Sequence, residues 1–159
     1  MKRVLLCVLS LCLLICFTGC DMSSLDKEDK EPISSREFKD YFKTNIGFDI
    51  YNIDLINYTY SYVIEAHNVD KKYSIYYFDC KNVVAAKYEF GKLVAEVNKF
   101  YGDNTVKNSK DIGNTSRYDI GDSETYSVVS RIGTTIIHTS TVPKSCQDEV
   151  KSYFDELGY

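Results

Sequence analysis

Residues 116–141 read SRYDIGDSETYSVVSRIGTTIIHTST. Two glycines divide this stretch, because Gly121 begins a Gly-Asp turn and Gly133 allows a tight turn between β-branched runs. The pattern predicts three successive antiparallel strands, the last two forming a hairpin: Ser116–Ile120, Thr125–Arg131 and Thr134–Thr141. Consecutive strands with no helix between them are typical of an antiparallel sheet, so this stretch sets the fold class.

A second strand-rich segment precedes it. A short extended piece is predicted over Phe48–Ile53, and two strands, Tyr60–Ala66 and Tyr73–Asp79, flank the polar break Asn68–Lys71, which has hairpin length. Tyr73–Asp79 has apolar residues on both faces. We therefore expect this strand to be central in its sheet and covered on both sides.

The first predicted helix, Ser34–Ile46, carries two start signals. Ser34 and Glu37 have the spacing of a capping box, and Ile33 and Phe38 can form a hydrophobic staple.

Asn82 can cap the longest predicted helix, Val83–Tyr101, whose apolar residues share one side. Gly91 in its middle costs roughly 1 kcal/mol relative to alanine. We attribute this glycine to a close approach between the helix and a strand.

Residues from Gly102 to Asn114 are predicted to form a polar loop. Near the end of the chain, Pro143 stops the last strand and Ser145 caps a final helix. The element order α-β-β-α-β-β-β-α predicts an α+β fold, with an antiparallel sheet of about five strands and helices packed on one face as a two-layer sandwich.

The N-terminus has the pattern of an export signal. Lys2 and Arg3 precede the apolar run Val4–Cys16, which has the length of a signal-peptide core. This run is shorter than the roughly 20 apolar residues that a transmembrane helix needs. An ordinary secretory signal and a chance apolar N-terminus remain as alternatives to a lipoprotein signal. Phe17-Thr18-Gly19-Cys20 resembles the lipobox of bacterial lipoproteins. That resemblance implies cleavage between Gly19 and Cys20, and attachment of Cys20 to the extracytoplasmic face of the cell membrane through diacylglyceryl and acyl chains.

Three regions follow from this interpretation: a signal peptide over 1–19, the lipidated cysteine with a disordered charged spacer over 20–32, and one α+β domain over 33–159. Without its signal peptide the chain has 17 basic and 23 acidic residues, a formal charge of −6. This acidic balance argues against nucleic acid as a partner. Cys80 and Cys146 are the two cysteines of the domain; they can form one disulfide, or each can be a small buried hydrophobic residue.

The sequence has no recognisable catalytic or metal-binding motif. His67 and His138 are isolated, and the acidic clusters Asp26–Glu31 and Asp119–Glu124 lack the order of ligands in a calcium loop. We therefore expect no catalytic residues, no metal and no cofactor. Tyr58, Tyr60 and Tyr62 recur at period two, which places three rings on one strand face, either as packing or as a binding surface.

A wider resemblance covers most of the domain. The segments YSIYYFDC, AAKYEFGKLVAEVNKFYG, SRYDIGDSETYSVVSRIGTTIIHTSTV and VKSYFDELGY are similar to small uncharacterised lipoproteins of low-GC Gram-positive bacteria. The leading hypothesis is a membrane-anchored, non-catalytic binding module whose partner is an envelope protein or a small ligand. Two further hypotheses are an inhibitor or immunity-type envelope protein, and an enzyme that uses carboxylates such as Asp79, Asp119 or Glu124 as acid and base.

Overall fold

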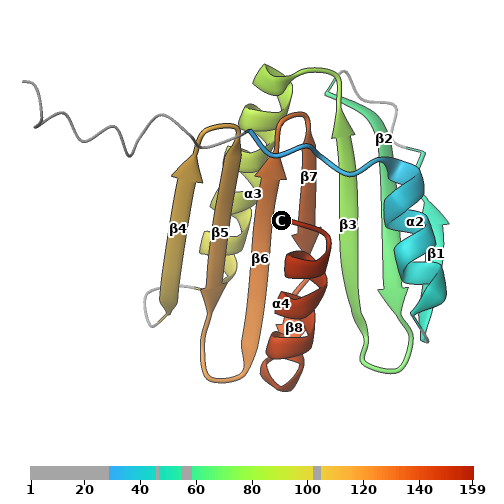
Figure 1. Cartoon of the computed structure of the whole chain (residues 1–159). Coiled ribbons are helices and arrows are strands. Elements are labelled where there is room, and N and C mark those ends of the chain that lie inside the picture. Colours follow the sequence, from blue (N-terminus) through green and yellow to red (C-terminus); the bar gives the residue numbers. More distant parts are fainter. Residues whose placement is uncertain (1–28, 46, 55–58, 102–104) are drawn as a thin grey trace, which may run out of the picture.

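The computed structural model describes residues 29–45, 47–54, 59–101 and 105–159. Within these residues, three α-helices and one eight-stranded antiparallel sheet form an α+β fold (Figure 1). The helices are α2 (Ser35–Thr44), α3 (Val83–Tyr101) and α4 (Gln147–Glu156), and a 3-10 turn, η2 (Lys144–Cys146), precedes α4. The strands are β1 (Phe48–Asn52), β2 (Tyr60–Asn68), β3 (Tyr73–Cys80), β4 (Val106–Ile112), β5 (Thr115–Gly121), β6 (Thr125–Ile132), β7 (Thr135–Thr139) and β8 (Val142–Pro143).

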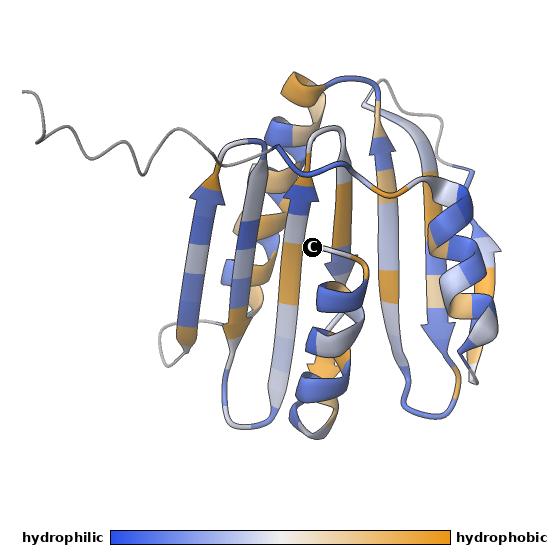
Figure 2. Cartoon of the chain, viewed as in Figure 1, coloured by the Kyte–Doolittle hydropathy of each residue, from blue (hydrophilic) through white to orange (hydrophobic). Residues whose placement is uncertain are grey.

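The strands lie in the order β1-β2-β3-β7-β6-β5-β4, and β8 pairs with β6. The three consecutive strands predicted from residues 116–141 are β5, β6 and β7, and β3 is a central strand as predicted. The estimate of about five strands is wrong chiefly because β4 lies in the segment predicted as a polar loop. The side chains of β4 are mostly polar and exposed (Figure 2), so only the backbone pairing with β5 reveals it as a strand.

Helices cover both faces of the sheet, which corrects the prediction of a two-layer sandwich. On one face, α2 and α4 place Phe38, Phe42, Val150 and Phe154 in a cluster with alternate residues of β3. On the opposite face, α3 places Ala86, Leu93 and Val97 against the other set of strand residues. The physical reason is visible in β3, where both faces are apolar and each requires a cover. We call these the α4 face and the α3 face.

The helix starts follow the predicted signals, with one exception. Ser34 and Glu37 form the capping box, and the Asn82 side chain accepts a hydrogen bond of 2.9 Å from the backbone N–H of Ala85. Ser145 does not cap α4, because η2 precedes the helix and Cys146 occupies the N-cap position without a side-chain hydrogen bond. The end of the first helix was predicted at Ile46, which lies outside the described residues; α2 ends at Thr44.

Two glycines illustrate different constraints. A Cβ on Gly121 would lie 2.8 Å from the backbone oxygen of Thr125, so the turn between β5 and β6 requires glycine there. A Cβ on Gly91 would meet no atom of the described residues within 4 Å, so the close approach to a strand that we expected is wrong. Gly91 faces outward from α3.

Residues 29–33 cross the end of the sheet where β3, β4 and β6 finish (Figure 1). The Asn114 side chain accepts from Lys30 N at 3.1 Å and donates to Lys30 O at 2.7 Å, and Tyr77 Oη donates to Ile33 O at 3.1 Å. We call this segment the strap. The predicted spacer over 20–32 therefore includes residues that contact the domain, whereas its residues 20–28 lie outside the described part of the chain.

No helix within the described residues is long and apolar enough to span a membrane.

Candidate functional site

The α4 face is covered unevenly, and the uncovered part contains a groove. Beside α4, the side chains of β4, β5 and β6 surround a hollow of about 450 Å³. Its lining includes Lys30 of the strap, Lys110 of β4, Arg117 of β5, Ser130 of β6 and Asp155 of α4. A hollow of this volume is of the size that holds a small ligand.

A second hollow, of about 230 Å³, continues along β5 toward the opposite end of the sheet. Arg117 lines both hollows, and Asp119, Tyr126, Lys144 and Lys151 line the second one. We call the two hollows together the Arg117 groove.

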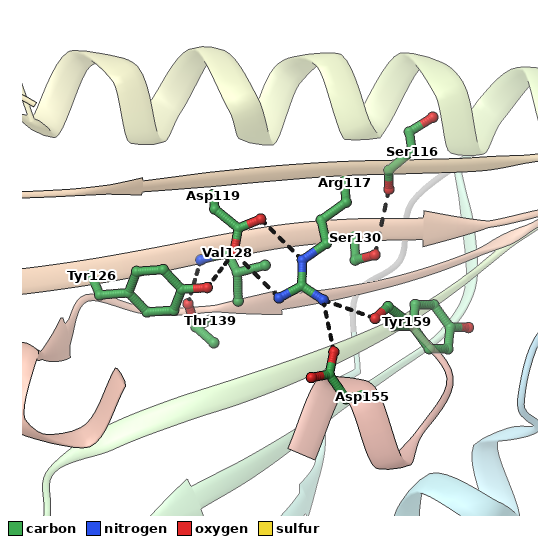
Figure 3. A network of polar contacts seen from close by, with 9 residues as sticks. All are labelled: Ser116, Arg117, Asp119, Tyr126, Val128, Ser130, Thr139, Asp155 and Tyr159. Carbon is green, nitrogen blue, oxygen red and sulfur yellow. Dashed lines mark hydrogen bonds and ion pairs between the residues drawn. The ribbon is translucent and has the colours of Figure 1, made fainter. Parts of the chain in front are cut away.

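Arg117 is fixed on one edge by the partly buried carboxylate of Asp119 (Figure 3). Its Nε lies 3.0 Å from Asp119 Oδ2 and its Nη2 lies 3.3 Å from Asp119 Oδ1, and Asp119 is only 16% exposed. The guanidinium also lies 5.6 Å from the centre of the Phe154 ring, so α4 packs over it. Burial opposes the charge of Arg117, but the hydrogen bonds and charge of Asp119 outweigh it and raise the pKa of Arg117.

The other edge of Arg117 has one close partner and one distant, exposed partner. Its Nη1 donates to the backbone oxygen of Tyr159 at 2.9 Å and lies 3.4 Å from Asp155 Oδ1, and the Asp155 side chain is 74% exposed (Figure 3). Exposed ion pairs of this kind contribute little to stability. An anion that enters the larger hollow can therefore replace Asp155 at this edge while Asp119 keeps the guanidinium in place.

Tyr126 completes the buried side of the site. Its hydroxyl donates to Asp119 Oδ1, and burial together with that carboxylate raises the pKa of Tyr126, so the phenol stays neutral. Asp119 thus has two structural partners, Arg117 and Tyr126. This pairing leaves the carboxylate little freedom to act as a general acid or base.

The groove carries positive charge on an acidic protein. Among the described residues, five basic side chains line it against two acidic side chains, whereas the whole chain has a formal charge of −4. Lys30 Nζ donates to Gly158 O at 2.6 Å, and Lys151 Nζ lies 5.6 Å from the centre of the Tyr126 ring. Because both carboxylates already contact Arg117, the lysines give the groove a positive potential toward an incoming ligand.

A second buried arginine, Arg131, lies on the α3 face and has a different role. Its Nη1 donates to the backbone oxygens of Asn114 and Gly133 at 3.1 and 3.2 Å, and its Nη2 donates to Ser116 Oγ at 2.7 Å. It therefore joins the turns that follow β4 and β6, and it lines no part of the groove.

The predicted tyrosine surface is not formed by the residues that the structure describes. Tyr58 lies outside them, and the register of β2 shifts between Tyr60 and Tyr62. That bulge turns the two rings to opposite faces of the sheet. Tyr60 is 7% exposed and packs in the core of the α3 face. Tyr62 is 38% exposed, and its hydroxyl accepts a hydrogen bond of 2.8 Å from Lys39 Nζ of α2.

Cys80 and Cys146 are free thiols in the structure and lie in different clusters on opposite faces of the sheet. The arrangement therefore agrees with two small buried hydrophobic residues, and it does not join the pair as a disulfide. Burial raises the pKa of the Cys80 thiol to about 12, so this thiol is unreactive at neutral pH.

The remaining candidates do not assemble into a site. The carboxylates Asp79, Asp119 and Glu124 lie on β3, on β5 and in the turn before β6, respectively. The rings of His67 and His138 contact Ser74 Oγ and the backbone oxygen of Val128, respectively. Among the described residues, no group of three or more His, Cys, Asp or Glu side chains could hold a metal ion. Gly19 and Cys20 lie outside the described residues.

Sequence reasoning missed Arg117 as a site residue, although a signal was present. Arg117 and Asp119 alternate with Tyr118 and Ile120 along β5, so two charged residues share one face of a strand whose other face is apolar. Comparisons with protein-family models, with curated proteins and with solved structures found no match to this chain.

Proposed function

We propose that this chain is an exported, lipid-anchored and non-catalytic binding module that holds a small anionic ligand in the Arg117 groove. The observation that carries the ligand class is the long, exposed contact between Arg117 Nη1 and Asp155, which lies in a hollow of about 450 Å³ beside Lys110. Carboxylate and phosphate groups match the paired donors of a guanidinium edge. The lipobox Phe17-Thr18-Gly19-Cys20 supports the anchoring part of the proposal.

The ligand proposal is tested with inorganic phosphate and succinate as anionic probes and with ethanolamine as a cationic one. A site with a Kd near 1 mM stabilises the fold by about 1.4 kcal/mol at 10 mM ligand, which corresponds to a rise in Tm of about 5 °C for a domain of this size. We expect this rise with at least one anion and not with ethanolamine. No rise with either anion would refute the proposed ligand class.

Two substitutions localise the effect. Lys110→Glu should weaken anion binding at least about fivefold, because it places a negative charge in the hollow. The matched control is Lys107→Glu, since Lys107 lies on the same strand but on the opposite face, and it should leave the affinity unchanged. Asp155→Asn removes the competing carboxylate and should tighten binding by up to about fivefold. Equal effects of the two lysine substitutions would place the anion elsewhere.

The anchor is tested independently. Mass spectrometry of the mature protein should find an N-terminal Cys20 that carries acyl chains, and the Cys20→Ala variant should leave the membrane fraction. A mature N-terminus at another residue would overturn the lipobox assignment while leaving the groove untouched.

A further inference from the structure

The surface of α3 that faces away from the sheet has an unusual composition for an acidic protein. Its exposed residues include two large apolar side chains, two small residues and lysines, among them Val84, Lys87, Tyr88, Gly91, Ala95 and Lys99. We call this surface the α3 outer face. Val84 is 78% exposed and Tyr88 is 70% exposed, one helical turn apart.

The acidic residues of α3 lie away from the centre of this face. Glu89 is buried against the sheet side, where Lys92 Nζ lies 3.3 Å from its Oε1. Glu96 lines a hollow at the margin of the helix together with His138. Lys87 and Lys99 have no ion pair with any residue that the structure describes. The centre of the α3 outer face is therefore apolar with positive flanks, which is the composition that anionic lipid surfaces attract.

The strap determines how far this face can be from a bilayer. Its hydrogen bonds to Asn114 fix the chain at Lys30, at the end of the sheet where α3 begins. Cys80 N donates to Thr134 O at 3.0 Å at that same end, two residues before the cap of α3. The N-terminal segment and the start of α3 therefore lie at one end of the molecule, on opposite sides of the sheet.

The length of chain between this end and Cys20 allows contact. Eight residues, 21–28, separate Cys20 from Asp29. Fully extended they reach about 26–29 Å. The thickness of the molecule from the strap to the plane beyond α3 is roughly 20–25 Å, from a layer spacing and a helix diameter of about 10 Å each. An anchor at Cys20 thus keeps the α3 outer face within reach of headgroups.

We propose that the α3 outer face rests on the anionic phospholipid headgroups of the membrane that holds the anchor. This proposal rests on the lipid anchor of the proposed function. It also accounts for Gly91, which is costly in mid-helix and which no other described part of the chain approaches, because a face without a side chain there lets the helix lie close to the bilayer. The ligand groove then lies on the side that faces away from the membrane, since Arg117 is on the α4 face.

The test uses the absence of tryptophan from the chain, which makes Tyr88→Trp a single fluorescent reporter. The mature chain with Cys20→Ala is mixed with vesicles of neutral phosphatidylcholine, and with vesicles that also contain phosphatidylglycerol. We expect a blue shift of the emission and quenching by brominated acyl chains with the anionic vesicles only. In that background, Lys87→Glu combined with Lys99→Glu should weaken vesicle binding at least about twenty-five-fold, because each lysine near an anionic surface contributes about fivefold.

The matched control is Arg36→Glu combined with Lys43→Glu, which makes the same change in charge on exposed positions of α2. It should retain vesicle binding. Equal losses in the two double variants, or no blue shift with either kind of vesicle, would overturn the proposal. If acylated Cys20 keeps the wild-type chain on membranes while the reporter shows no contact, the anchor stands and the α3 docking fails. Protection of Lys87 and Lys99 from acylation in cells, without contact in vesicles, would assign the face to a protein instead.

Discussion

His138 makes the stability of this protein depend on pH in a way that one substitution can isolate. The imidazole lies half-buried under α3, where its ring stacks on Tyr76 and its Nδ1 lies 3.3 Å from the backbone oxygen of Val128. Burial disfavours the charged form and lowers the pKa of His138 to about 4, against 6.5 for an unperturbed histidine. His138 lines a hollow beside α3, and Glu96 and Tyr101 of that helix line it too.

The direction of this pH dependence follows from where the folded and unfolded chains bind a proton. The unfolded chain takes up a proton at His138 below about pH 6.5, whereas the folded chain does so only near pH 4, so stability is lost as the pH falls through this window. At pH 5 the two pKa values correspond to a loss of about 2 kcal/mol, and at pH 7.5 the loss is close to zero.

The measurement is urea unfolding at pH 7.5 and pH 5.0 for the wild type and for His138→Gln. Carboxylates also titrate in acid, but they are common to both proteins and cancel in the comparison. We expect the wild type to lose about 2 kcal/mol more than His138→Gln between the two pH values. Ile136→Val, two residues away on the same face of β7, should cost about 1 kcal/mol at both pH values and keep the wild-type pH difference. An equal pH difference in the wild type and in His138→Gln would refute the reasoning.

Three further substitutions test the packing, each by chemical denaturation. Gly91→Ala should stabilise the protein by about 0.5–1 kcal/mol, because nothing lies near a Cβ at this position of α3, and a loss of stability would contradict that. Gly121→Ala should destabilise it by more than about 1 kcal/mol, since its Cβ would meet Thr125 O at 2.8 Å; a neutral result would mean that the turn moves freely. Phe154→Ala should cost about 3–5 kcal/mol, because this buried ring packs in the core of the α4 face and against the Arg117 guanidinium, and a cost below about 1 kcal/mol would show that neighbouring side chains refill the space.

Local signals in the sequence predicted the elements whose start or turn has a side-chain cause. Ser34 with Glu37, Asn82, and Gly133 each act within a few residues, and the structure confirms all three. The strand β4 has no such signal, because its exposed polar residues are held in the sheet by backbone pairing with β5 alone.

Assignments of residues to faces failed for a related reason. One bulge between Tyr60 and Tyr62 places these two rings on different faces of β2, and nothing local in the sequence marks it. The placement of α3 opposite α2 and α4 followed from the two apolar faces of β3, which the sequence displayed and the predicted two-layer arrangement did not use. The charged pair Arg117 and Asp119 became a site only through α4, which lies about thirty residues later in the chain and brings Asp155 over it.

The proposed ligand groove and the proposed membrane contact lie on opposite faces of one sheet, and the strap connects the groove to the chain that leads to the anchor. Lys30 belongs to the strap and also lines the larger hollow, so the chain that leads to the proposed anchor forms one wall of the proposed ligand site. A pull on the anchor therefore acts on the Lys30 contacts with Asn114 and Gly158 before it reaches the core. Because Asp119 of β5 and the Phe154 ring of α4 also hold Arg117, the guanidinium would keep its position while the strap moves. Tension on the tether would thus move the Lys30 wall of the hollow and leave Arg117 in place.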